Sequence, residues 1–376
     1  MSILHESRGQ KFLTILERNS VPILFGVFCL IGIPLSGYSY GYLGQEIVVR
    51  IARNSFLIIA LLVPIMAGMG LNFGMTLGAM AGQIGLIFIA DWGIVGIPGM
   101  ALAMIISTPI SAFLGWLCGK ILNMAKGREM VTSYIIGFFI NGVYQLIVLY
   151  GMGSVIPIKN PALVLPRGYG IRNTVNLISI RKVLDNLLAF NIFDVSIPVA
   201  TLLLITSLCL FIIWFRKTKL GQDMRAVGQD MEVARAAGIK VEHTRIVSVM
   251  ISTILAGYGM IVYLQNIGTL NTYNSHMQIG MVSIAALLVG GATVNRAGIG
   301  NVFLGVSLFH LMFIISPTAG KNLIGEAQLG EYFRVFVSYG IITIALVLYE
   351  VRKRRDLARG GRLLAQDQSE LSKENP

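Results

Sequence analysis

Residues 221–239 read Gly-Gln-Asp-Met-Arg-Ala-Val-Gly-Gln-Asp-Met-Glu-Val-Ala-Arg-Ala-Ala-Gly-Ile, a polar and glycine-punctuated island between two long apolar runs. Residues 222–227 are predicted to form a first helical turn, with Gly228 as a break. Asp230 is a suitable N-cap for a second turn that runs through Ala237. We call residues 221–239 the docking segment, because so polar a loop in so apolar a chain indicates a partner.

The side chains of the docking segment favour contact with another protein over catalysis. Gly238 stands where a glycine commonly ends a helix. The small side chains that let another surface approach closely are Ala234, Ala236 and Ala237. The charged side chains expected to fix orientation at the rim are Arg225, Asp230, Glu232 and Arg235.

The composition of the whole chain excludes a water-soluble globule. Hydrophobic residues make up 55% of it and charged residues 13%, against roughly 25% charged residues in a soluble protein. Apolar runs of about 18 residues or more recur, and each can cross a hydrocarbon core roughly 30 Å thick. The net charge of +12 is explained by membrane topology rather than by nucleic acid, because the basic residues cluster between and after the apolar runs.

About ten transmembrane helices are expected, which makes the chain an all-α polytopic membrane protein. The predicted spans lie near residues 21–40, 54–70, 74–90, 96–118, 131–152, 195–215, 246–265, 279–292, 300–316 and 332–350. They form a single transmembrane domain over residues 1–350. A basic and then disordered tail follows over residues 351–376.

Basic residues set the predicted orientation. The N-terminal arm and the basic tail are both placed in the cytoplasm, which agrees with an even number of spans. The segment 216–245, with seven Lys and Arg residues, is then cytoplasmic too. Arg50 and Arg53 fit poorly, because they fall near an outer end of the second span. Either these two side chains snorkel or that span starts later.

The long segment 153–194 is then placed outside the membrane. Its first half is expected to be irregular, because it contains Pro157, Pro161 and Pro166. Residues 175–191 have a helix-like spacing of apolar positions. Two interpretations stay open for them: a helix lying on the membrane surface, or a gate or docking surface for an extracytoplasmic partner.

Motifs for catalysis and for metal binding are absent from the sequence. It contains no His-Glu-x-x-His pattern and no P-loop lysine motif, and its three isolated cysteines suit small core positions. His310 lies in a span, as a packing residue or as a ligand or proton carrier. Asp91 is expected at a span end as an interfacial residue. The spans therefore lack an obvious carboxylate for ion coupling.

Uncharged polar residues cluster in or just before the third and fifth spans. They are Asn72, Gln83, Tyr134, Asn141, Tyr144 and Gln145. Tyr134, Asn141 and Gln145 share one helix face. The cluster either joins helix to helix by hydrogen bonds or lines a path for a neutral hydroxylated solute. Tight helix packing is predicted by three glycines spaced four apart, Gly74, Gly78 and Gly82.

The docking segment resembles the cytoplasmic coupling segment of ABC importer permeases of the branched-chain amino acid, ribose and nucleoside type. That family has a Gly, then Arg-Ala-x-Gly, then Ala-Arg-x-x-Gly-Ile, followed by a basic stretch and a Gly-rich span. The matching positions are Gly221, Arg225-Ala226-Val227-Gly228, Ala234-Arg235-Ala236-Ala237-Gly238-Ile239 and Ala256-Gly257. Residues 71–83 and 285–293 add weaker matches, and the nucleoside branch, served by basic membrane lipoproteins, is loosely the nearest.

The resemblance implies a permease subunit of the bacterial inner membrane that is not an enzyme and binds no cofactor of its own. Two permease subunits, identical or different, would form a path at their interface. Two cytoplasmic ATPases, carrying ATP and Mg, would each receive a docking segment and tilt helices on binding ATP. An extracytoplasmic substrate-binding protein would deliver the solute, with nucleosides or sugars favoured.

Two other classes are weighed against this one. An ion-coupled secondary transporter would need an intramembrane carboxylate or an ion site. A membrane-embedded enzyme would need clustered His, Asp or Glu near a membrane face. Within the permease family, branched-chain amino acids and vitamins are the alternative solutes.

Overall fold

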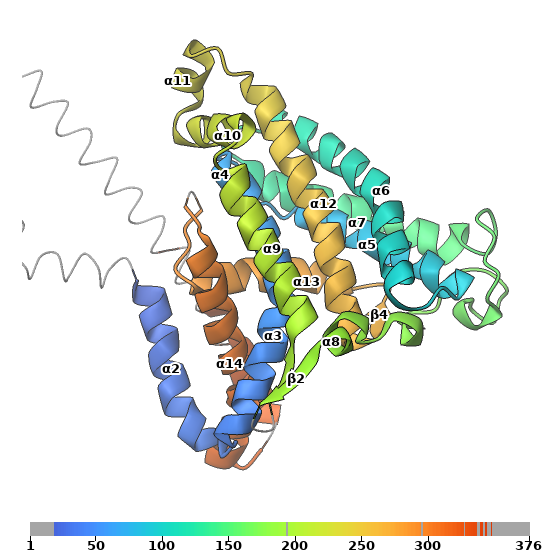
Figure 1. Ribbon diagram of the computed structural model, residues 1–376, viewed down its shortest axis with the longest axis vertical. Helices are drawn as coiled ribbons and strands as arrows, with labels where there is room; N and C mark the ends of the chain where they lie inside the picture. Colours follow the sequence, from blue (N-terminus) through green and yellow to red (C-terminus); the bar gives the residue numbers. More distant parts are fainter. Residues whose placement is uncertain are drawn as a thin grey trace, which may run out of the picture.

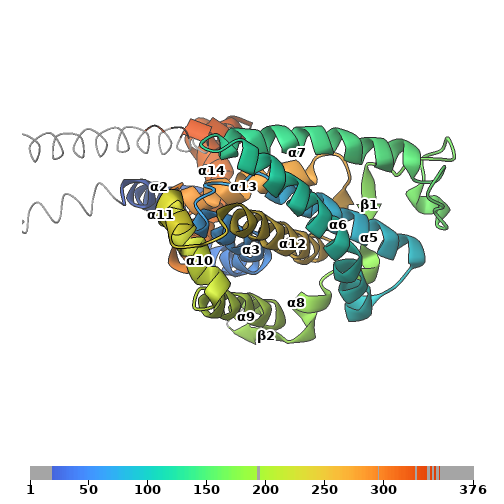
Figure 2. The same cartoon turned by 90° about the horizontal axis from the view of Figure 1, so that it is seen from above.

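The computed structural model describes residues 19–192, 195–294, 296–326 and 328–336, together with residues 339, 340, 343 and 347. Over these residues the chain is an array of long helices with two short two-stranded sheets (Figure 1, Figure 2). The predicted N-terminal arm and the tail over 351–376 lie outside the described residues.

Most of the first half of the chain is helical. Its helices are α2 Ser20–Ser36, α3 Tyr40–Ala60, α4 Leu62–Met66, α5 Met75–Trp92, α6 Gly96–Met124 and α7 Glu129–Leu146, which continues as the π-helix η1 Ile147–Gly151. The next segment is made of short elements, η2 Pro161–Leu163, β1 Thr174–Asn176, η3 Ile178–Ile180, α8 Val183–Leu187, β2 Ala189–Ile192 and β3 Val195–Pro198. The second half contains α9 Val199–Phe215, α10 Lys219–Gln229, α11 Met231–Ala236, α12 Val241–Ile267, β4 Thr269–Asn271, α13 Ser275–Val289 and α14 Ile299–Ile324.

Helix α12 lies at the centre of the array and packs against α3, α5 and α6 (Figure 2). Glycines on α5 make this packing close. A Cβ atom at Gly78 would lie 2.0 Å from the carbonyl oxygen of Thr253, and one at Gly82 would lie 2.5 Å from that of Gly257. The predicted packing role of these two glycines is confirmed.

Within the part of the chain that the structure describes, six helical segments are long and apolar enough to cross a membrane, and the number becomes seven if α9 and α10, which meet at 74°, are taken as one span. The six are Tyr40–Met66, Met75–Trp92, Gly96–Met124, Glu129–Gly151, Val241–Ile267 and Ile299–Leu323. The chain is therefore an all-α polytopic membrane protein. Helix lies at the first nine predicted positions in whole or in part, but α2 and α13, with 17 and 15 residues, are short. Most of the tenth predicted span, residues 332–350, lies outside the described residues.

The second predicted span was placed wrongly. Helix α3 begins at Tyr40, where the Ser39 side chain accepts a hydrogen bond from the backbone N–H of Tyr42, rather than near residue 54. Arg50 and Arg53 therefore lie inside the helix instead of at its end. Arg50 pairs with Glu46 at 3.3 Å. The Arg53 guanidinium donates a hydrogen bond to the side-chain oxygen of Asn266 and lies over the Tyr263 ring, both on α12.

The helix predicted over residues 175–191 is also wrong, because only Val183–Leu187 is α-helical there. Strand β1 pairs antiparallel with β4, and β2 pairs with β3. The buried side chains of Val175 and Leu177 are two positions apart, which is the period of a strand. These strands and α8 lie at the opposite end of the molecule from α10 and α11 (Figure 1).

Candidate functional site

The docking segment folds as two short helices, α10 and α11, that cross the end of the helical array (Figure 1). The predicted cap is confirmed, because Asp230 Oδ1 accepts from the backbone N–H groups of Glu232 at 2.8 Å and Val233 at 3.0 Å. Gly238 has a φ of +84° directly after α11. The N–H of Ile239 then donates to the carbonyl of Ala234 at 3.0 Å, a hydrogen bond that commonly closes a helix end.

Gly228 does not break the first helix, contrary to prediction. Helix α10 continues through it to Gln229, and the N–H of Asp230 donates to the carbonyl of Ala226. The absence of a side chain has another purpose: a Cβ atom at Gly228 would lie 2.3 Å from the carbonyl oxygen of Met66. Helix α10 therefore rests directly on the backbone at the end of α4.

The small face predicted for α11 is only partly available to a partner. Ala234 is buried with Val227 and Val241, because it holds α11 against α10 and α12. Ala236 and Ala237 are exposed, and Val233 is 65% exposed beside them. The predicted apolar docking face is thus Val233, Ala236 and Ala237.

The charged residues predicted at the rim differ in whether their side chains form ion pairs within the chain. Arg235 pairs with Glu232 at 3.0 Å and with Glu242 at 3.1 Å, so it stabilises the α11–α12 corner. Gly221 and Ala226 lie on the inner side of α10, and a Cβ atom at Gly221 would lie 2.0 Å from the carbonyl oxygen of Phe215. Arg225 is exposed and faces a groove described below.

A buried arginine joins the docking segment to the spans. Arg245 on α12 is fully buried and forms an ion pair with Glu129 in the first turn of α7. Its other terminal nitrogen lies 3.4 Å from the sulfur of Met231 on α11. Sequence reasoning missed this joint, because nothing local signals a pair 116 residues apart.

Four of the six predicted path residues meet in one polar network between α5, α7 and α13. The Tyr144 hydroxyl donates to Gln83 Oε1 at 2.8 Å. Gln145 donates to Asn141 Oδ1 at 3.5 Å and to the backbone carbonyl of Tyr273 at 3.3 Å. His276, which was not predicted, bridges the two groups: its Nδ1 lies 3.0 Å from Gln83 Oε1 and its Nε2 lies 2.7 Å from Asn141 Oδ1.

The hydrogen bonds around Gln83 determine the role of His276. Gln83 Nε2 donates to the hydroxyl of Ser275 and to the carbonyl of Asn271, so its Oε1 must face the ring and His276 Nδ1 must carry a proton. His276 Nε2 faces Asn141 Oδ1 at 2.7 Å, and a solute that enters between the two could compete for this contact.

Asn72 and Tyr134 lie outside the network. Asn72 is buried, and its Oδ1 accepts from the N–H of Gly74, which makes it a turn residue. Tyr134 packs edge-on against Phe73 and Phe138. It lines a cavity of ≈310 Å³ with Met281 and Ile284 of α13, further along the α7–α13 crevice than His276.

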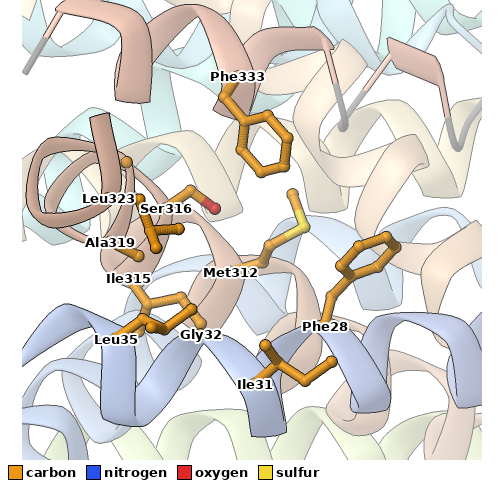
Figure 3. Close-up of a pocket in the computed structure, with 11 residues that line it drawn as sticks. Phe28, Ile31, Gly32, Leu35, Met312, Ile315, Ser316, Ala319, Leu323 and Phe333 are labelled. Carbon is orange, nitrogen blue, oxygen red and sulfur yellow. The ribbon is translucent and has the colours of Figure 1, made fainter. Parts of the chain in front are cut away.

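A second cavity, of ≈230 Å³, lies between α2 and α14 and is closed on one side by Phe333 (Figure 3). Ser316 supplies the one polar side chain among the described residues that line it. It therefore offers little to a hydroxylated solute, whose hydrogen bonds would go unmade.

Asp91 lies at the end of α5, as predicted, but in a different setting, whereas His310 agrees with the packing alternative. Asp91 is buried rather than interfacial, and its Oδ1 accepts from the N–H groups of Lys159 and Asn160 at 2.7 and 2.8 Å, so it anchors the segment after η1. His310 is buried against Phe309 and Phe313. Within the described ranges no group of three His, Cys, Asp or Glu residues could hold a metal ion.

Comparison with known proteins gives one family. The family described as branched-chain amino acid transport system / permease component matches residues 47–347. The chain is 25% identical to the nucleoside ABC transporter permease protein of Lactococcus lactis subsp. cremoris, over 73% of this chain and 71% of the relative. It is 23% identical to the autoinducer 2 import system permease protein of Photorhabdus luminescens, over 91% and 93%. No solved structure gives a significant match.

A third relative is the D-allose transport system permease protein of Escherichia coli, which is 23% identical to the chain over 86% of this chain and 90% of the relative.

Proposed function

Because the chain belongs to the family of branched-chain amino acid transport system permease components, we propose that it forms the path of an ATP-binding-cassette importer for a nucleoside or a sugar. It is a multi-pass membrane transport subunit and not an enzyme. Importers of this class work with an ATPase and a substrate-binding protein. ATP and Mg accordingly belong to the ATPase, which receives the docking segment on the cytoplasmic side.

The polar network on α5, α7 and α13 is the observation that carries the solute class. Gln83, Asn141, Tyr144 and Gln145 combine donors and acceptors without fixed charge. Such a lining suits hydroxyl groups, because it replaces the hydrogen bonds that a sugar makes with water. Relatives named for nucleoside, xylose, arabinose and galactose transport agree with it.

The crevice between α7 and α13 is the proposed route. His276 and Asn141 lie toward one end of it, and the ≈310 Å³ cavity beside Tyr134 lies toward the other. Thr76 of α5 lies between the two helices, close enough that a Cβ atom at Gly137 or Gly280 would contact its side chain at 3.0 or 2.6 Å. Helices this close must move apart before a solute passes.

A second permease subunit is proposed to cover the open face of α7. Four large apolar side chains on that face are 39–70% exposed, namely Ile135, Phe138, Phe139 and Val143. The proposed route along the α7–α13 crevice then lies beside the subunit interface.

The Arg245–Glu129 ion pair supplies a mechanical link for coupling. Movement of α11 reaches Arg245 through Met231, and Arg245 is bonded to the start of α7. Helix α7 carries Asn141, Tyr144 and Gln145, so displacing it changes the network around His276. ATP-driven closure of the ATPases would thereby open or close the crevice.

Uptake into proteoliposomes tests the proposal. The chain is reconstituted with its ATPase and its substrate-binding protein, and ATP-dependent uptake of labelled uridine, ribose and leucine is measured. We expect ATP-dependent uptake of uridine or ribose and none of leucine. Uptake of leucine alone would contradict the solute class, and uptake that does not depend on ATP would contradict the importer.

A further inference from the structure

A polar groove of ≈690 Å³ lies where three parts of the chain meet beside α10. One wall is the end of α4 at Met66, another is α10 with Arg225 and Gln229, and the third is the loop between α13 and α14 with Arg296. Arg216, just after α9, completes the lining. Three arginines, one just after α9, one on α10 and one in the loop between α13 and α14, therefore line one space.

The ion pairs formed among the described residues leave these three arginines out. They involve instead Arg50, Lys126, Arg235, Arg245 and Arg334. Two acids stand near Arg225 in sequence, Asp223 and Asp230, and neither forms an ion pair with it among the described residues. Asp230 uses one carboxylate oxygen to cap α11. Three like charges around one groove repel one another, and an anionic ligand relieves that repulsion.

We infer that this groove receives acidic side chains of the ATPase subunit. The inference rests on the proposed function and adds a second contact to the docking segment. Carboxylates match guanidinium groups in charge and in bidentate geometry. The groove shares α10 with the docking segment, and this continuity favours the ATPase over an anionic lipid headgroup of the same charge.

The groove has a mechanical consequence for the importer. A carboxylate that bridges Arg225 and Arg296 ties α10 to the loop before α14, and that loop follows α13, which carries His276. The ATPase would then grip both sides of the crevice, α7 through Arg245 and α13 through Arg296. Charge pairs of this kind also speed encounter and make it salt-dependent.

The test is capture of the ATPase by the tagged chain in nanodiscs of neutral phosphatidylcholine. The variant R216E/R296E changes two groove arginines outside the docking segment. We expect it to lower ATPase affinity by about tenfold or more and to flatten the dependence of capture on salt. K217E is the matched control, since Lys217 is exposed next to Arg216 but does not line the groove, and R296K should retain most of the capture.

Three results would overturn the inference. Equal capture by R216E/R296E and wild type would show that the ATPase does not bind in the groove. Equal capture with loss of bound phosphatidylglycerol, in nanodiscs that contain it, would assign the groove to a lipid. A wild-type chain that captures no ATPase would overturn the proposed function as well, which separates the two failures.

Discussion

In the docking segment the capping hydrogen bonds join residues no more than five positions apart, whereas the polar network joins Gln83 to residues 61 and 193 positions away. A helix pair closed by its own caps keeps its shape when it moves as a body. A network shared by three helices changes partners when any of the three moves. We therefore expect the first region to transmit a displacement and the second to respond to it.

The largest expected effect comes from cutting the joint between the two regions. R245Q leaves Glu129 without its charge partner in a mostly buried site, and breaking a buried pair costs about 3–5 kcal/mol. We expect ATP hydrolysis to persist while uptake is lost, measured on the same proteoliposomes. The charge swap R245E/E129R should recover part of the uptake.

The exposed pair of Lys126 and Glu242 provides the control for this variant. K126Q removes an ion pair whose side chains are 39% and 54% exposed, and such pairs contribute about 0–1 kcal/mol. Uptake by K126Q should match wild type. Normal uptake by R245Q would show that the two regions are not joined through this arginine.

The next effect concerns how α10 rests on α4. G228A places a Cβ atom 2.3 Å from the Met66 carbonyl oxygen, and overpacking of this kind costs about 1–3 kcal/mol. Uptake should fall strongly while the protein stays in the membrane. Gly300 is the matched control, because a Cβ atom there meets nothing within 4 Å, so G300A should transport normally. Equal uptake by both variants would show that transport does not depend on the close contact between α10 and α4.

A smaller effect is expected in the network itself. H276A and N141L/Q145L each leave buried hydrogen-bonding groups without partners, which costs about 1–3 kcal/mol per site. Uptake should drop, and capture of the ATPase should not change. L210A, an exposed position on α9, serves as the control. Loss of capture in the network variants would make these residues structural instead.

The smallest effect separates docking from folding on α11. A236L adds bulk at an exposed position, so the stability of the chain should change by no more than about 0.5 kcal/mol, while ATPase capture falls. A234L adds the same bulk between Val227 and Val241 and should lower stability first. Thermal unfolding followed beside capture distinguishes the two, and equal capture by A236L and wild type would move the docking face elsewhere.

Sequence reasoning reached the features that depend on neighbouring residues. Asp230 and Gly238 were placed correctly because caps are local, and most of the long apolar helices fall near predicted spans because apolar runs are local too. The start of α3 was missed because Arg50 and Arg53 read as an interface, while their partners Glu46, Asn266 and Tyr263 lie partly on other elements.

The remaining errors share the same origin. His276 gave no sequence signal, because its partners Gln83 and Asn141 are 193 and 135 positions away. The segment 175–191 has apolar spacing that fits a helix, but its two ends pair as strands, with β4 at one end and with β3 at the other. Gly228 was taken as a helix break because its tertiary contact with Met66 cannot be read from the docking segment alone.

The most direct test of the account is cross-linking from the docking face. The natural cysteines Cys29, Cys118 and Cys209 are buried, so V233C introduces an exposed thiol on α11. V155C introduces an exposed thiol in the segment 153–194, which is predicted to lie outside the membrane. In native membrane vesicles, V233C should cross-link to the ATPase and react with an impermeant maleimide from the cytoplasmic side only, whereas V155C should do neither. A V233C thiol that reacts only from outside and yields no ATPase adduct would contradict both the orientation and the docking segment.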